Sequence, residues 1–281
     1  MLDESVTDIK IAIKVYLEYK KEYIKTFLLF LTGIVVLVFS GFIILRFVIL
    51  ENYFQFDEII RLFIILIILL ILSLIFFLLL SYARTTFGLT YDIMTSGELY
   101  TEFRRSLTYF KKFWLYFILL SLPYALIIGL DQLFGLFSLL ELIQSHDGNR
   151  NLLVIIKIVV YLFDFLLYIS LIEIFPSIIV VKNLRQSITE NFTIASQNFN
   201  RLFYSIGTYY IAFRGPMFLV DITRILIVAN ETTFLFFNII FAIVAFINAL
   251  IGLPILSLIS TRIYNTIILT TATDGIESHD K

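Results

Sequence analysis

Apolar residues fall into long, nearly uninterrupted runs along this chain of 281 residues. Between residues 62 and 80 only Ser73 is polar, and no residue is charged. A run of about 20 apolar residues, rising about 1.5 Å per residue as a helix, matches a hydrocarbon core about 30 Å thick. Each central Leu, Ile, Phe or Val favours insertion by roughly 0.3 to 0.6 kcal/mol. The pattern therefore predicts a membrane span.

The same criterion predicts an all-α, polytopic integral membrane protein with six transmembrane helices. The apolar runs are continuous, whereas the strands of a membrane β-barrel alternate apolar and polar residues. We treat residues 1–281 as a single membrane domain. The predicted spans lie near 27–50, 60–82, 113–137, 152–178, 202–229 and 233–260.

Basic residues between the spans alternate in number at every crossing. The N-terminal segment, the second loop, the fourth loop and the tail together hold fifteen Lys and Arg residues. The other three loops, counted with the adjoining ends of the spans, hold three: Arg61, Arg150 and Arg224. Because cytoplasmic loops of membrane proteins are enriched in Lys and Arg, both termini are predicted to be cytoplasmic.

Three polar-apolar stretches with helical period precede spans, at 12–27, 99–114 and 184–203. Apolar residues that recur every three or four positions form one stripe of a helix. Such helices are expected in the cytoplasmic headgroup layer with the stripe facing the lipid. In the alternative, each stretch is the solvent-exposed end of a longer helix; the interfacial interpretation is favoured for 99–112 and 184–200. The stripes at the two ends of this series are Ala12, Tyr16, Tyr19, Tyr23 and Phe27, and Leu184, Ile188, Phe192, Ala195, Phe199 and Phe203.

The stretches recur at a spacing of 87 to 89 residues. A unit of one interfacial helix and two spans, used three times, would explain this spacing. Two spans per unit preserve orientation, so such repeats would be parallel rather than inverted.

Composition narrows the class of protein further. Apolar residues make up 60% of the chain and charged residues 15%, below the roughly 25% of a soluble domain. The net charge of −1 argues against nucleic acid as a partner, since a nucleic-acid binder needs a basic face. The chain has no Cys, which excludes disulfides and thiolate metal sites. The expected partners are the lipid bilayer and either another membrane protein or a second copy, in the cytoplasmic membrane of a microbe.

A proline that ends a predicted span, an apolar run and an amphipathic helix leading to an aromatic span entry follow one another at 175–203. This segment resembles the membrane region associated with glycerophosphoryl diester phosphodiesterases, and uncharacterised six-span membrane proteins of bacteria and archaea. The rest of the chain resembles them by span layout alone, and Lys182 stands where relatives often carry an acid. The phosphodiesterase catalytic domain is absent from the sequence, so the resemblance implies no such activity. The positions that fit are Pro176, Ser196, Asn198, Arg201, Leu202 and Phe203.

Charged residues within the predicted spans are candidates for function, because a charge near the bilayer centre costs at least about 2.5 kcal/mol. Lys157 and Asp164 are seven residues apart in the fourth span, on nearly one face. Counting about 1.5 Å per residue, Asp164 and Arg214 differ in depth by about 6 Å. We therefore expect Arg214 to pair with Asp164, with Lys157 nearby and Asn248 of the sixth span joining them.

These charges have two interpretations. They form a polar passage or substrate site, or they are a buried ion pair that fixes the register of the helices. Prolines within the spans likewise act as hinges or as static kinks. The predicted kinks are Pro123, Pro176, Pro216 and Pro254.

No recognisable catalytic motif is present. The two histidines, His146 and His279, fall in a loop and in the tail, and no metal or cofactor site is predicted. The sequence therefore favours a non-enzymatic scaffold or accessory subunit of a membrane process. The alternative is a transporter of small solutes or lipids that uses the intramembrane charges.

Overall fold

The computed structural model describes residues 2–50, 58–96, 150–171, 176–177, 184–227 and 231–277. All secondary-structure elements in these residues are helices, as predicted. The predicted span 113–137 with Pro123, and the amphipathic stretch at 99–112, lie outside them.

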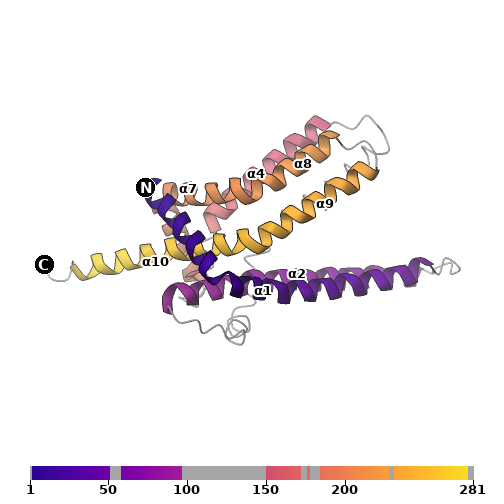
Figure 1. The fold of residues 1–281 in the computed structure, drawn as a ribbon, viewed down its shortest axis with the longest axis horizontal. Coiled ribbons are helices and arrows are strands. Elements are labelled where there is room, and N and C mark those ends of the chain that lie inside the picture. Colours follow the sequence, from indigo (N-terminus) through magenta and orange to yellow (C-terminus); the bar gives the residue numbers. More distant parts are fainter. Residues whose placement is uncertain are drawn as a thin grey trace.

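The helices form two arms joined at one end (Figure 1). One arm pairs α1 with α2, and the other pairs α4 with α8, while the continuous rod of α9 and α10 passes between them. The short helix α6 leads into α7 and then α8. The bounds are α1 Leu2–Leu50, α2 Glu58–Ser96, α4 Arg150–Leu171, α6 Leu184–Gln197, α7 Phe199–Tyr209, η1 Tyr210–Arg214, α8 Gly215–Ile227, α9 Glu231–Ile247, η2 Asn248–Gly252 and α10 Leu253–Glu277.

In the described residues three helices are long and apolar enough to cross a membrane: Asp3–Ser40, Leu152–Ser170 and Leu235–Ile267. Large apolar side chains on these helices point outward, and Phe39 and Leu235 are 65% and 61% exposed. This exposed apolar surface is typical of a protein that contacts lipid.

The core lies where the N-terminal half of α1 meets α2, α7 and α10. Leu202 and Leu258 are fully buried there. A buried chain of hydroxyl groups crosses the three helices α1, α2 and α10: Tyr23 Oη lies 2.9 Å from Thr90 Oγ1, which lies 2.7 Å from Ser257 Oγ. Small hydroxylated residues let helices approach closely and hydrogen-bond to one another in lipid.

The amphipathic stretch 12–27 belongs to this core. Ala12, Tyr16, Tyr23 and Phe27 are all buried against other helices of the protein. The expectation that this stripe faces the headgroup layer is therefore wrong. The stretch is the first part of α1, which bends at Tyr19 with φ −103° and ψ 16°.

The stretch at 184–203 behaves differently. It forms a separate helix, α6, which ends at a bend at Asn198 before α7 begins. Its aromatic stripe faces outward, with Phe192 55% exposed, whereas the polar Ser187 and Asn191 are buried. An outward apolar stripe is what an interfacial helix requires.

At two of the prolines predicted to kink a helix, Pro216 and Pro254, a turn of π-helix lies directly before the proline. Gly215 N–H donates to the carbonyl of Tyr210, five residues back, and Pro216 follows. Leu253 N–H donates in the same way to Asn248, and Pro254 follows. A wider turn relieves the clash between a proline ring and the carbonyl four residues back. Pro176 is buried.

The second π-turn frees carbonyl groups that tyrosines of other helices satisfy. Tyr82 of α2 donates its hydroxyl to the carbonyl of Ala249 at 2.7 Å. Tyr16 of α1 donates its hydroxyl to the carbonyl of Leu250 at 3.4 Å. Pro254, four residues later, has no N–H group to donate to this carbonyl. Neighbouring helices are the usual source of such compensation within a membrane.

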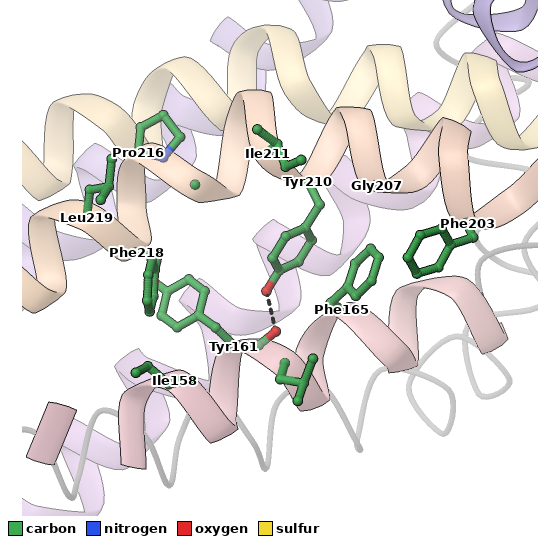
Figure 2. Close-up of a pocket in the computed structure, with 12 residues that line it drawn as sticks. Ile158, Tyr161, Phe165, Phe203, Gly207, Tyr210, Ile211, Pro216, Phe218 and Leu219 are labelled. Atoms are coloured by element: carbon green, nitrogen blue, oxygen red, sulfur yellow. Dashed lines mark hydrogen bonds between the residues drawn. The ribbon is translucent and has the colours of Figure 1, made fainter. Parts of the chain in front are cut away.

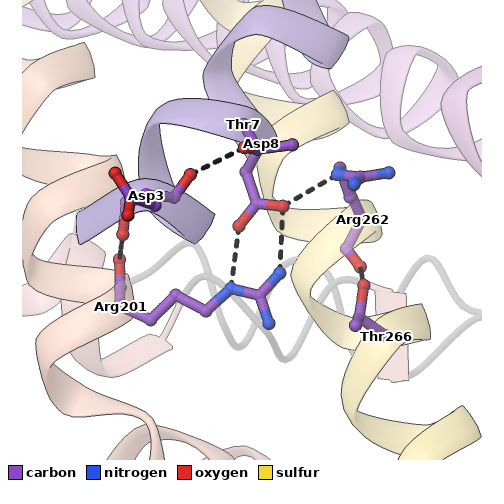
Figure 3. Close-up of polar contacts among 7 residues, drawn as sticks. Asp3, Thr7, Asp8, Arg201, Arg262 and Thr266 are labelled. Atoms are coloured by element: carbon purple, nitrogen blue, oxygen red, sulfur yellow. Dashed lines mark hydrogen bonds and ion pairs between the residues drawn. The ribbon is translucent and has the colours of Figure 1, made fainter. Parts of the chain in front are cut away.

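One carboxylate on α1 accepts hydrogen bonds from arginines of α7 and α10, near the end at which the two arms join (Figure 3). Asp8 of α1 is 1% exposed and accepts from Arg201 of α7, with Nε–Oδ2 at 2.8 Å and Nη2–Oδ1 at 2.9 Å. It also accepts from Arg262 Nε of α10 at 2.7 Å. Bidentate arginine-carboxylate pairs are strong and fix geometry. We call these three residues the Asp8 clasp.

Asp8→Asn should lower the free energy of unfolding by about 3 kcal/mol, because two arginines then lose their counter-charge. Asp3→Asn is the matched control: Asp3 is exposed on the same helix, so its loss should change stability by less than about 0.5 kcal/mol. Unfolding of the purified chain in detergent measures both. Equal midpoints for the two variants would contradict a structural role of the clasp.

Candidate functional site

The charged residues of α4 and α8 meet along one contact line. On α4, Lys157, Tyr161, Asp164 and Tyr168 follow at steps of four, three and four, which places them on one face. That face packs against α7 and α8, and Asp164 on it contacts Tyr210 and Arg214 of η1. We call the charged residues along this line the seam, namely Lys157, Asp164, Arg214, Asp221 and Arg224.

Asp221 is the centre of the first group in the seam. It is 1% exposed, and its Oδ2 lies 3.5 Å from Lys157 Nζ, while its Oδ1 lies 2.9 Å from Arg224 Nη2. Tyr161 donates its hydroxyl to Asp221 Oδ2 at 3.2 Å. Arg224 Nη1 donates in turn to Asn238 Oδ1 at 3.0 Å, so the group ties α4 and α8 to α9.

The second group is the pair that the sequence predicts. Arg214 Nη2 lies 3.8 Å from Asp164 Oδ2. Tyr210 donates its hydroxyl to the same oxygen at 3.1 Å. Arg214 Nη2 also donates to Tyr168 Oη at 2.8 Å, and the guanidinium lies over the Tyr168 ring, 5.4 Å from its centroid. A guanidinium is well suited to such a mixture of ion pairing and ring contact.

Asn248 reaches this group through intermediates. Its Oδ1 accepts from Tyr209 Oη at 3.2 Å, and its Nδ2 lies 3.7 Å from Met217 Sδ. The same sulfur lies 3.8 Å from Arg214 Nη1. The contact depends on Gly252, where a Cβ would collide with Asn248 Oδ1 and lie 3.0 Å from the Phe213 ring.

The structure thus brings Arg214, Asp164 and Asn248 together, and it assigns Lys157 a partner that the sequence analysis did not select. The same depth argument could have found it. Lys157 lies about 8 Å from the outer end of its predicted span and Asp221 about 12 Å from that of its own, at about 1.5 Å per residue. Arg224, counted above as a loop residue, lies within α8.

The seam holds three cations and two carboxylates, and each cation has an acidic partner. Within the described residues no group of three or more His, Cys, Asp or Glu side chains could hold a metal ion. The arrangement can bind helices to one another in a medium of low dielectric constant.

An apolar groove borders the seam between α4 and the rod of α7, η1 and α8 (Figure 2). Its volume is about 630 Å³. Aromatic rings and branched side chains form its walls, and the hydroxyl of Tyr210 points across to the carbonyl of Tyr161 at 2.7 Å. We call it the lateral groove.

No protein-family model, curated protein or solved structure matches this chain.

Asp221→Asn should destabilise the protein by about 3 kcal/mol or more, because Lys157 and Arg224 then stay buried without their carboxylate. Adding Lys157→Met should recover part of this loss, since one of the two stranded cations is removed. Unfolding of the wild type, the two single variants and the double variant in detergent gives the coupling energy. Purely additive effects would show that the two side chains do not interact.

Proposed function

We propose that this chain is a non-enzymatic, multi-pass protein of a microbial cytoplasmic membrane, acting as a scaffold or accessory subunit of a membrane process. The observation that carries the proposal is that the buried charges of the seam pair with one another. Their contacts join α4, α8 and α9 and so serve helix packing. Charges that act on a substrate would instead need to face a cavity that the substrate can enter.

The proposal includes six spans with both termini in the cytoplasm. The Asp8 clasp favours it, because the clasp joins the N-terminal segment, the start of α7 and the C-terminal part of α10, three segments that the basic-residue count assigns to one side. The proposal also includes the resemblance of 175–203 to the membrane region associated with glycerophosphoryl diester phosphodiesterases. A threefold repeat of one amphipathic stretch and two spans is part of the same proposal, with the stretch 12–27 packed in the core rather than at the interface.

The alternative is a transporter of small solutes or lipids. A small-solute passage would need polar, water-accessible space beside Arg214. The groove next to it has apolar walls, which favours the scaffold over a small-solute transporter and leaves lipid as the substrate class that a transporter of this shape would suit.

Because the chain has no Cys, single-cysteine variants report topology directly. Asp3→Cys, His146→Cys and Ser278→Cys should differ in intact cells: a membrane-impermeant thiol reagent should label only position 146. All three positions should react once the cells are permeabilised. Labelling of either terminal position in intact cells would contradict the proposed orientation.

A scaffold should contact another protein through the polar face of α6. A photoreactive amino acid in place of Thr193, which is exposed on that face, should give a protein adduct of defined mass in the native membrane. The same amino acid in place of Phe236, 60% exposed on α9, is the matched control and should give no protein adduct. Adducts at neither position, together with solute release from vesicles that contain the chain, would favour the transporter instead.

A further inference from the structure

The lateral groove opens on a surface that faces outward. Four of the apolar side chains that line it are about half exposed or more: Ile158 is 47%, Leu162 57%, Ile211 76% and Leu219 63% exposed. In a membrane such a surface contacts hydrocarbon. Within the described part of the chain, the groove is therefore open toward lipid along its length.

The walls of the groove offer no free hydroxyl group to a polar ligand. The ring of Tyr210 lines the groove, but its hydroxyl shares its one proton between the carbonyl of Tyr161 and Asp164 in the seam. The hydroxyl of Tyr161 donates to Asp221 in the same way. A ligand in the groove thus meets rings and methyl groups, which suits a hydrocarbon and not a polar solute.

A helix does not fit inside the groove. Its walls run from Phe203 to Leu219, sixteen residues or about 24 Å of helix. Counted out to its open side, the empty space in the groove is about 1230 Å³. An α-helix of that length, about 10 Å across with its side chains, occupies roughly 1,900 Å³. One methylene chain fits, since non-bonded carbon atoms pack about 4 Å apart.

Two glycines leave this space. A Cβ on Gly207 would meet only the Phe165 ring, at 3.8 Å, and a Cβ on Gly215 only the carbonyl oxygen of Tyr210, at 3.9 Å. Both are ordinary van der Waals distances, so no close helix contact requires glycine at either position. The missing side chains instead widen the groove, which both residues line.

A row of aromatic rings leads into the groove from the junction of α6 and α7. Phe199 and Phe203 have ring centroids 5.8 Å apart, Phe203 and Phe165 lie 5.6 Å apart, and Phe165 and Tyr210 5.1 Å apart. Phe199 and Phe203 belong to the outward stripe that continues from α6. Because α6 carries the outward apolar stripe of an interfacial helix, its junction with α7 is expected at the boundary between headgroups and hydrocarbon.

We propose that the lateral groove binds one acyl chain of a membrane lipid, with the lipid headgroup at the junction of α6 and α7. The proposal is independent of the scaffold function, because a scaffold can act with or without a bound lipid. It requires only that the chain lies in a bilayer.

The test uses the full chain in phosphatidylglycerol vesicles that contain a small fraction of phosphatidylcholine with a photoreactive diazirine on one acyl chain. After illumination, mass spectrometry of peptides locates the lipid adducts. Adducts at Leu162 and Ile211 should be several-fold more abundant than at Leu235 and Ile239 of α9, which are 61% and 53% exposed. Those α9 residues report ordinary contact with the surrounding lipid.

Gly207→Leu and Gly215→Leu should each fill the groove and reduce its adducts to the α9 level. Ala212→Leu is the matched control. Ala212 is exposed on the same rod but does not line the groove, so this variant should leave the adducts at Leu162 and Ile211 unchanged. If one glycine variant fails to fold, the other still tests the proposal, since each side chain enters at a different point of the groove.

Three results would overturn the proposal. Groove adducts equal to those on α9 would mean surrounding lipid only, and adducts below that level would mean that protein covers the groove. Rapid disulfide cross-linking of two Ile211→Cys chains in the same vesicles would identify a second copy as the occupant. Because none of these readouts involves the Thr193 adduct or vesicle leakage, failure here leaves the proposed function standing.

Discussion

A charge that leaves water for the low-dielectric interior of a membrane protein needs a counter-charge and hydrogen bonds at once, and the positions of α4, α8 and α9 follow from this requirement. Asp221 satisfies Lys157 and Arg224 together, and Arg224 extends the contact to Asn238. Helices that could slide past one another on apolar contacts alone are thereby held at one register. The Asp8 clasp does the same for α1, α7 and α10.

Backbone carbonyl groups inside the membrane also need hydrogen-bond donors, and each proline removes one such donor. A proline inside lipid leaves a carbonyl without its donor, and both Pro216 and Pro254 are preceded by a π-turn that widens the helix. The extra residue in a π-turn rotates every later side chain by about 100° around the axis. The two turns contact each other, and the contact places Asn248 beside Tyr209. The distortion of the helices and the placement of polar groups therefore have one cause.

The sequence predicts helices and intramembrane pairing well for physical reasons. Long apolar runs permit only a spanning helix, and depth counted in residues is enough to bring Arg214 and Asp164 together. The same count places Lys157 and Asp221 within about 4 Å of each other in depth, so the sequence could have predicted this pair too. A helical stripe, in contrast, has a limit. It shows which face of 12–27 is apolar, but protein and lipid are both apolar neighbours, and here tyrosine hydroxyls with partners such as Thr90 and Leu250 draw the stripe into the core.

The lateral groove could not be read from the sequence, because glycine in a membrane helix signals close packing as often as it signals space. The structure distinguishes the two roles. Gly252 is crowded by Asn248 and Phe213, whereas Gly207 and Gly215 have room for a side chain. Tyr161 and Tyr210 join the groove to the seam, since each presents its ring to one and its hydroxyl to the other. Because the seam carboxylates accept from these hydroxyls, the two rings face the groove and its walls stay apolar. The carboxylates that pair with the cations of the seam therefore also contribute to the apolar character of a groove whose occupant would not contact them.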